Sequence, residues 1–443
     1  QRRVLEENNN RILADQTTWG IKMIQADQLD IGPDPVKLCI IDTGYAIHHP
    51  DLPSDVSGDN AINYNGEIWD WKIDFNGHGT HIAGIIAALG KNNIGVVGVG
   101  EIPLHITRGL DDRQSGNESD AIDAIKQCIA AGAKVINMSL GSRRMSEVAA
   151  DLYTKAVNED GVIIVAAAGN GGRREYLYPA SHPDVISVAA VYGWENYWEY
   201  SNYGDQVELA APGHDILSTT TTFTAVHTYD FSYTAVQLAG SRSREQRGNL
   251  VDCGSGNTVC REAGNQREGG ICLMYRDHMH IRHMVHNCVS GKGQGVIIFD
   301  ASPNTDSSTL SVRINIPVVV VSNTVGKALL DLLRSGKSNQ VSIGFHESDQ
   351  PEHTYALFEG TSMAVPHVAA AAALLWSHFP ECNNHEIRYA LDVSALDKGN
   401  DGCDESYGYG IVKVKDAYDW LSNNPCGTGS WGKPGHGGGC RIV

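Results

Sequence analysis

The sequence predicts an α/β fold in which a parallel sheet lies between layers of helices, and two observations support this. Four short apolar runs show no alternation of polar and apolar residues: 36–41, 134–138, 162–168 and 185–190. Such runs are typical of parallel strands that are buried on both faces. Helical patterns accompany them at 79–89, 118–131, 146–159 and 362–378. Strands and helices in regular succession indicate helices layered on a sheet.

The regular succession stops near Thr220, which predicts a second domain. Residues 221–353 are rich in Thr, Gly, Asn and Cys, with separate strand-like runs at 295–299 and 316–321. A segment of this length can form its own hydrophobic core. Because the alternation resumes near Tyr355, we expect this domain to be inserted into the first one. The tail 426–443 is Gly-rich, and we expect it to be an extension held by a disulfide.

Charge and composition exclude some partners. The 443 residues carry a formal net charge of −18, and the isoelectric point is near 5.4. Such an acidic chain is not expected to bind nucleic acid or anionic membranes. No run of about eighteen apolar residues is present, so we expect no membrane-spanning helix. The chain opens on a polar stretch without the pattern of a signal peptide.

The ten cysteines predict a secreted protein with disulfides. Eight of them lie close together in twos, and loop-rich sequence with local pairs is typical of secreted proteins. The expected pairs are Cys253 with Cys260, Cys272 with Cys288, Cys382 with Cys403, and Cys426 with Cys440. The other two, Cys39 and Cys128, lie in apolar stretches and are expected to be buried thiols.

Three polar residues stand where chemistry is possible. Asp42 ends an apolar run, and the carboxyl end of a buried parallel strand faces the ligand-binding edge of α/β proteins. His78 opens a helical stretch within Gly-His-Gly-Thr-His, and Ser362 opens another within Gly-Thr-Ser-Met-Ala. Each has a simpler interpretation: a turn-capping aspartate, a structural histidine and a helix N-cap serine. A helical zinc motif is not favoured, because no Glu follows His78 as HExxH requires.

The order of these residues along the chain favours a serine hydrolase. Asp, then His, then Ser differs from the order in chymotrypsin-like proteases and in α/β-hydrolases. An α/β-hydrolase would also have GxSxG, whereas Ala364 stands in the last Gly position.

Five motifs in sequence order resemble the core of subtilisin-like serine proteases. They are IIDTGYAIHHPDL, NGHGTHIAGIIAAL, VINMSLG, VIIVAAAGNGG and GTSMAVPHVAAAAALL. The resemblance covers roughly 16–220 and 354–425, and it implies a three-layer α/β/α sandwich with a mostly parallel sheet. Segment 1–15 would then be the tail of a propeptide, with self-cleavage around residues 14–17.

The resemblance implies a role for each site residue. Ser362 would be the nucleophile, His78 the general base and Asp42 the residue that orients the imidazole. Asn170 would donate to the oxyanion together with the backbone N–H of Ser362. Substrate would lie extended against two edges and a small uncharged pocket, which suits an apolar or aromatic side chain before the scissile bond. The residues concerned are Ser115, Gly116, Ser139, Leu140, Gly141, Ala168 and Gly169.

The same resemblance implies one structural calcium ion. Its ligands would be side-chain oxygens of Gln16, Asp51 and Asn92 and backbone carbonyls of Leu89, Ile94 and Val96. All are hard oxygen donors, as calcium prefers. The loop at 90–93 is one residue longer than the family pattern and carries a lysine.

The inserted segment has a resemblance of its own. GNLVDCGSGNTVC, GGICLMYRD, NCVSGKGQGVIIFD and INIPVVVVSNTVGKALLDLL resemble the β-rich protease-associated domain that many secreted subtilisin-like enzymes contain. We therefore expect residues 221–353 to be such a domain.

Taken together, these patterns predict a secreted, monomeric serine endopeptidase that is made as a zymogen. Its partners would be protein or peptide substrates and its own propeptide. Two alternatives stay open: a more selective processing protease, which the acidic pair Asp111 and Asp112 allows, and a non-catalytic binding protein on a protease scaffold.

Overall fold

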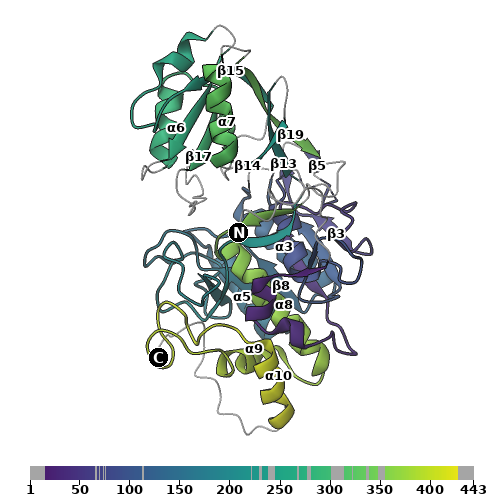
Figure 1. Ribbon diagram of the computed structural model, residues 1–443. Helices are drawn as coiled ribbons and strands as arrows, with labels where there is room; N and C mark the ends of the chain where they lie inside the picture. Colours follow the sequence, from purple (N-terminus) through teal and green to yellow (C-terminus); the bar gives the residue numbers. More distant parts are fainter. Residues whose placement is uncertain are drawn as a thin grey trace. The chain divides into compact units, whose positions relative to one another are not determined.

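A computed structural model describes most of the chain and divides it into two compact units (Figure 1). The first unit comprises 1–111, 115–221 and 354–443, and the second comprises 112–114 and 222–353. The residues that the structure describes are 15–64, 67–68, 70–72, 74, 76–111, 114–220, 222–228, 232–237, 245–266, 269–276, 281–300, 314–321, 323–335, 339–347 and 355–427. The expected propeptide tail lies almost entirely outside them, as does most of the Gly-rich tail.

A seven-stranded sheet forms the centre of the first unit, in the order β11-β10-β9-β8-β2-β7-β3. Every neighbouring pair of strands is parallel. Six of the strands are buried along their length, whereas the edge strand β3 is polar and partly exposed. In sheet order the strands are Leu209–Pro212, Ile186–Val191, Ile163–Ala167, Val135–Met138, Leu38–Asp42, Leu104–Arg108 and Ser57–Asn60.

Helices cover both faces of this sheet. The helices α3 (His78–Ala87) and α8 (Thr361–His378) pack on one face, and α4 (Glu118–Ala130) and α5 (Glu147–Asn158) on the other. Strand β2 shows why both faces are apolar: Leu38 and Ile40 enter the core under α3 and α8, and Ile41 enters the core under α4 and α5. The predicted three-layer α/β/α sandwich is therefore confirmed.

Smaller elements complete the first unit. Strand β1 (Gln16–Thr17) pairs with β6 (Val96–Val97) in parallel, and β4 (Asn63–Tyr64) pairs with β5 (Glu67–Ile68). Strand β12 (Ile216–Thr219) pairs with β20 (Tyr355–Phe358) in antiparallel register, although residues 222–353 of the second unit separate them in sequence. The remaining helices are α2 (Trp19–Met23), η1 (Ala26–Gln28), α9 (Asn384–Val393) and α10 (Val414–Asn423).

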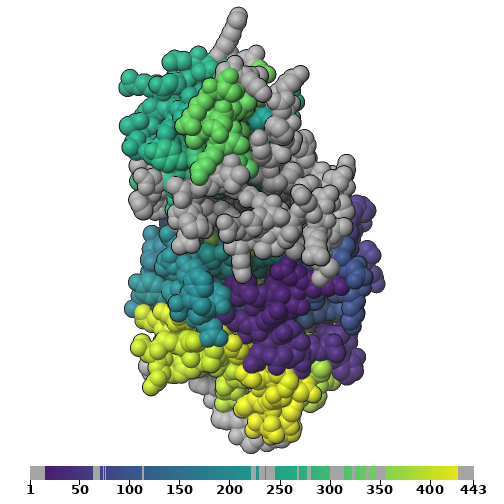
Figure 2. All heavy atoms as spheres, viewed as in Figure 1, coloured from purple at the N-terminus to yellow at the C-terminus, as the bar shows by residue number. Residues whose placement is uncertain are grey.

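The first and last described segments of the first unit lie side by side. Figure 2 shows the purple N-terminal segment against the yellow C-terminal one. Lys413 donates from Nζ to the carbonyl oxygen of Met23 at 2.7 Å, and Gln25 donates from Nε2 to Asp416 Oδ2 at 3.1 Å. No helix in the described part of the chain is both long and apolar enough to span a membrane.

The second unit is a closed barrel with the strand order β13-β14-β18-β17-β16-β15-β19. Alternate residues of β16 enter different cores: Cys272 and Met274 pack with α6, while Ile271 and Leu273 pack with α7. In chain order the elements are β13 Thr222–His227, β14 Ser232–Gln237, β15 Gln246–Asp252, η2 Arg261–Asn265, β16 Gly270–Arg276, α6 Ile281–Ser290, β17 Gly295–Asp300, β18 Val318–Val321, α7 Asn323–Arg334 and β19 Gln340–Glu347.

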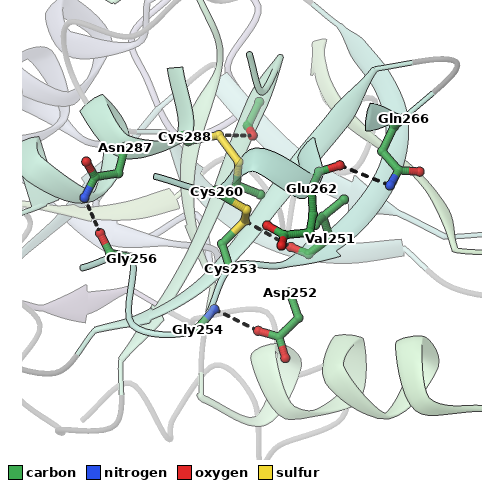
Figure 3. The surroundings of a disulfide bond; sticks show 12 residues. Val251, Asp252, Cys253, Gly254, Gly256, Cys260, Glu262, Gln266, Asn287 and Cys288 are labelled. Carbon is green, nitrogen blue, oxygen red and sulfur yellow. Dashed lines mark hydrogen bonds between the residues drawn. A yellow bond between two sulfur atoms is a disulfide. The ribbon is translucent and has the colours of Figure 1, made fainter. Parts of the chain in front are cut away.

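Two disulfides of this second unit join the expected partners, Cys253 with Cys260 and Cys272 with Cys288. Figure 3 shows the surroundings of the Cys253–Cys260 disulfide. Both disulfides connect neighbouring parts of the core under α6.

The first unit corrects the other cysteine predictions. Cys39 and Cys128 are not thiols but form a disulfide, because β2 and α4 pack in one core and bring the two Cα atoms within 5.6 Å. Cys382 pairs with Cys426 rather than with Cys403, since the Cα atoms of Cys382 and Cys426 lie 5.1 Å apart. Cys403 is itself disulfide-bonded, and Cys440 lies outside the described residues.

Candidate active site

The structure brings Asp42 and His78 into direct contact. Asp42 ends strand β2, and His78 is the first residue of α3, where Gly77 takes the left-handed conformation that turns the chain into the helix. His78 Nδ1 lies 2.8 Å from Asp42 Oδ1, which also accepts the backbone N–H of Thr43 at 2.8 Å. Asp42 is fully buried, and the side chain of His78 is 10% exposed. The imidazole thus has one nitrogen fixed by a carboxylate.

The pKa of His78 is raised above its ordinary value, although burial acts against this. Burial alone would lower the pKa, because it disfavours the imidazolium. The negative charge of Asp42, its hydrogen bond to the ring and the charge of Asp74 together outweigh burial. A proton on His78 is therefore stabilised by the site.

Asp74 supports the loop before His78, and we did not predict this from the sequence. Its carboxylate accepts hydrogen bonds from the Thr43 hydroxyl, from Thr80 N and Oγ1, and from the backbone N–H groups of Asn76 and Gly77. These bonds hold the loop that leads into α3 and thus place His78. The visible indication was a polar Asp-x-Asn-Gly run directly before a helix start, a pattern common to many loops.

Ser362 is the second residue of α8, whose N-cap is Gly360 at φ 134°. Ser362 Oγ donates to the carbonyl oxygen of Ser139 at 3.2 Å, and Ser139 Oγ donates to the carbonyl oxygen of Ser362 at 2.8 Å. Among the described residues, no hydrogen bond joins Ser362 to His78. In free serine hydrolases this bond is often long or poorly aligned, and it tightens when substrate binds.

Asn170 is anchored through one end of its side-chain amide. Its Oδ1 accepts from Thr361 N at 2.9 Å and from Thr361 Oγ1 at 2.8 Å. The Nδ2 group donates to no other described residue, so it is available to a ligand. A Cβ at Gly360 would stand 3.0 Å from this Nδ2, so a side chain there would crowd the donor.

Three of these groups meet at one edge because of the strand order. Strands β9, β8 and β2 are neighbours, and their carboxyl ends lead to Asn170, Ser139 and Asp42 respectively. Carboxyl ends of parallel strands are where α/β proteins bind ligands.

The expected substrate-binding residues lie on both sides of β2 in the sheet order. Ser139, Leu140 and Gly141 follow β8, and Ala168 and Gly169 follow the adjacent β9. Ser115 and Gly116 follow β7, which lies on the other side of β2. Two hydrogen bonds hold this loop: Ser115 N donates to Asp111 Oδ1 at 2.9 Å, and Asp111 N donates to Ser115 O at 2.8 Å.

Asn202 supports this edge and was also missed. Its side chain is fully buried, donates from Nδ2 to Ala168 O at 3.1 Å and accepts from Gly171 N at 2.8 Å. Its backbone N–H donates to Gly169 O at 2.7 Å. Asn202 therefore fixes the backbone on both sides of Asn170. Nothing in the sequence near Asn202 distinguishes it from a loop asparagine.

The six expected calcium ligands are close neighbours. Gln16 on β1 is paired with Val96 on β6. Leu89 N donates to Asp51 O at 3.0 Å, and Ile94 N donates to Asn92 Oδ1 at 2.9 Å. The buried carboxylate of Asp51 accepts from Asn92 Nδ2 at 2.7 Å, from Val96 N at 2.9 Å and from the Tyr355 hydroxyl at 3.0 Å.

This donor set fits calcium in its chemistry. Burial raises the pKa of Asp51, and the hydrogen bonds from Asn92, Val96 and Tyr355 compensate for the buried charge only in part. No cationic side chain pairs with it among the described ion pairs. A calcium ion would supply that compensation, and it would compete with the three donors that now hold the carboxylate.

The fold and the arrangement of Asp42, His78 and Ser362 define the class, a protein of subtilisin-like architecture. The chain belongs to the subtilase family, peptidase S8, whose family model matches residues 34–246 and 301–410.

Individual relatives agree with this assignment. The chain is 38% identical over 197 residues to halolysin of Haloferax mediterranei, a match that covers 44% of this chain and 38% of the halolysin. It is 38% identical over 215 residues to subtilisin DY of Bacillus licheniformis, covering 46% of this chain and 76% of that protein. The chain thus spans well under two thirds of the halolysin, though more of subtilisin DY.

A solved structure matches nearly the whole chain. It is the crystal structure of a psychrophilic subtilisin-like protease from the Antarctic psychrotroph Pseudoalteromonas sp. AS-11. The TM-score is 0.61 at 29% sequence identity, and the match covers 93% of this chain and 99% of that one.

Proposed function

We propose that this protein is a serine endopeptidase that hydrolyses peptide bonds in proteins through an acyl-enzyme. The observation that carries the proposal is the contact between His78 Nδ1 and Asp42 Oδ1 at the end of β2, together with the hydrogen bond from Ser362 Oγ to Ser139 O after the adjacent strand β8. Family membership and relatives that are named as proteases support it.

In the proposed reaction His78 Nε2 takes the proton from Ser362 Oγ while that oxygen attacks the scissile carbonyl carbon. The Asp42 carboxylate fixes the tautomer that leaves Nε2 free to accept, and it stabilises the imidazolium that forms. The negative oxygen of the tetrahedral intermediate accepts from Asn170 Nδ2 and Ser362 N. His78 then protonates the leaving amine. In the second half of the reaction His78 takes a proton from water, the water oxygen attacks the acyl carbon, and the proton returns to Ser362 Oγ as the acyl bond breaks.

For the substrate we propose an extended segment of a protein, with an apolar or aromatic side chain before the scissile bond. The small uncharged residues after β8 and β9, which include Gly141, Ala168 and Gly169, support this preference. A more selective processing protease is the alternative, and cleavage-site profiling on a peptide library separates the two.

Secretion, a propeptide and a monomeric state belong to the same proposal. The described disulfides support an oxidising compartment, because such bonds are rare in the cytosol. N-terminal sequencing of the active enzyme tests maturation: a start near Gln16 supports a propeptide, and a start at Gln1 contradicts it.

We also propose that the chain binds one structural calcium ion through Gln16, Asp51, Leu89, Asn92, Ile94 and Val96. Subtilases commonly bind structural calcium, and the buried charge of Asp51 supports a site here. The ion would stabilise the fold and would take no part in the reaction.

The replacement of Ser362 by alanine tests the proposed activity. Ser362→Ala should lower kcat by several orders of magnitude, because the covalent step loses its nucleophile. Ser119→Ala is the matched control, since Ser119 is likewise the second residue of a helix, α4, but is exposed. Cleavage of a chromogenic peptide by both variants measures the difference. Activity of Ser362→Ala equal to that of an active control would contradict the assignment of Ser362 as the nucleophile, whereas no cleavage by the parent or by either variant would favour a binding protein.

A further inference from the structure

His214 stands between two carboxylates close to the proposed nucleophile. Its Nε2 lies 3.2 Å from Glu359 Oε2, and its Nδ1 lies 3.4 Å from Asp215 Oδ2. The two carboxylates differ in environment, because the side chain of Glu359 is 6% exposed and that of Asp215 is 64% exposed. The contact with Glu359 is therefore the one that is shielded from water.

The contact lies just beyond the end of the ladder between β12 and β20. Ile216 pairs with Phe358, so His214 and Glu359 extend from the two strands where regular pairing ends. One backbone hydrogen bond joins the two segments beyond the ladder: Gly360 N donates to Gly213 O at 2.7 Å. The side chains of His214 and Glu359 thus reinforce the point at which the chain enters α8.

This point carries the groups that the proposed reaction needs. Glu359 precedes Gly360, the N-cap of α8, and Ser362 follows two residues later. Thr361, between them, donates to Asn170 Oδ1 and also accepts from Gly169 N at 3.2 Å. A displacement of Gly360 would consequently move both Ser362 and the amide of Asn170.

Two aromatic rings lie near His214. The ring of Tyr192 lies 4.5 Å from it and the ring of Trp198 lies 6.4 Å from it, measured between centroids. Trp19 Nε1 donates to the carbonyl oxygen of Asp215 at 3.3 Å and holds the backbone beside it. In this partly shielded setting the contact between His214 and Glu359 is stronger than the same contact on an open surface.

A metal ion explains this cluster less well. His214, Asp215 and Glu359 come close enough together to be considered as ligands. The two carboxylates, however, approach opposite nitrogens of the same ring, and a metal ion binds a histidine through one nitrogen only.

We propose that His214 and Glu359 are positioning residues, whose contact holds Gly360 so that Ser362 and Asn170 keep their reactive placement. The proposal rests on the proposed peptidase function. Because a misplacement of about 1 Å can cost roughly 10²-fold in rate, the contact should affect turnover more than substrate binding.

A double-mutant cycle on a peptide substrate tests this. His214→Ala and Glu359→Ala should each lower kcat about tenfold or more, with KM within about twofold of the parent. The double variant should be no slower than the slower single variant, since both changes remove one contact. Asp215→Asn is the control: it removes the exposed charge from the same histidine, asparagine tolerates the φ of 52° at this position, and kcat should stay within about twofold of the parent.

Active-site titration with a serine-directed reagent counts the competent sites, so that kcat per site is known even where a variant is partly unfolded. Single variants with the kcat of the parent, losses that multiply in the double variant, or a rise in KM alone would each overturn the proposal. Failure of the proposed function is distinguishable, because then the parent itself would not cleave the peptide faster than Ser362→Ala.

Discussion

At the scale of single residues, the environment of His78 decides at which pH the site can work. A histidine serves as general base only when its Nε2 is unprotonated, and the site stabilises the proton through Asp42 and Asp74. Burial lowers the pKa of His78, so removal of either carboxylate should lower this pKa further. The Asp42 contact therefore affects both the orientation and the pKa of the imidazole.

We predict that the pH dependence of activity follows from this raised pKa. Activity should be lost as the pH falls through the pKa of His78, so the midpoint of the acid limb of kcat/KM should lie above about 6.5, the ordinary value for histidine. In Asp42→Asn the remaining effect of burial should move the pKa of His78 below that of the parent. NMR titration of the His78 ring in both proteins measures this, because the variant is expected to be roughly 10⁴-fold slower. A midpoint that is unchanged in Asp42→Asn would show that Asp42 does not set this pKa.

At the scale of elements, the buried carboxylate of Asp51 links β6 to β20, and β1 in turn pairs with β6. The Tyr355 hydroxyl reaches it from β20, and Val96 reaches it from β6. If the Asp51 carboxylate binds calcium, the binding of the ion is coupled to the packing of β1, β6 and β20.

We predict that removal of calcium lowers the melting temperature, because a ligand that binds only the folded state stabilises it. Asp51→Asn should lower the melting temperature in calcium and abolish its response to chelator. Asp123→Asn is the control, since this carboxylate is 60% exposed and lies on α4. Calorimetry with and without chelator gives the answer. Equal melting curves for the parent under both conditions would mean that the hydrogen bonds to Asp51 stabilise the fold without an ion.

Four of the six buried strands of the large sheet could be predicted from the sequence, whereas β7, β11 and the links between distant elements were not. The four apolar runs are β2, β8, β9 and β10, and the four helical stretches are α3, α4, α5 and α8, with bounds shifted by one or two residues. The edge strand β3 was missed because its sequence, Ser-Gly-Asp-Asn, is polar. A strand at a sheet edge needs only one neighbour and no apolar pattern.

The residues of the candidate site likewise fall into those that the sequence predicts and those that only the fold identifies. Asp42, His78, Ser362 and Asn170 could be proposed because each follows a strand or begins a helix in a recognisable motif. Asp74, Asn202 and Tyr355 act through contacts that depend on the folded loops. The Asp-x-Asn-Gly run at Asp74 is common to many loops, and the sequence around Asn202 and Tyr355 gives no indication of their contacts. The Cys39–Cys128 disulfide was missed for a related reason, because 89 residues separate its partners and only the packing of α4 on β2 brings them together.

At the scale of the whole molecule, the second unit is connected to the first at positions that already pair with each other. Thr219 and Tyr355 are partners in the ladder between β12 and β20. The barrel has its own cores, and none of the proposed catalytic residues belongs to it. We therefore propose that it influences which proteins are cleaved and has little effect on the chemical step.

We predict that replacing residues 222–353 with a short Gly-Ser linker leaves the cleavage of a tetrapeptide nearly intact. The ladder between β12 and β20 can close over a short connection, so the proposed site should keep its support. The choice among large protein substrates should change. Competition assays with protein mixtures measure this, and a melting curve shows whether the variant is folded. A folded variant that treats peptides and proteins as the parent does would contradict this role.

The most direct test of the central claim is to identify the residue that a serine-directed organofluorophosphate modifies. Only a serine activated by a neighbouring base reacts readily with such a reagent. We predict a single modified residue, Ser362, with loss of peptide cleavage in proportion to labelling and no labelling of Ser362→Ala. Peptide mapping by mass spectrometry locates the adduct. Cleavage that persists in the fully labelled protein, or an adduct on another serine that accompanies the loss of activity, would contradict the assignment of Ser362 as the nucleophile.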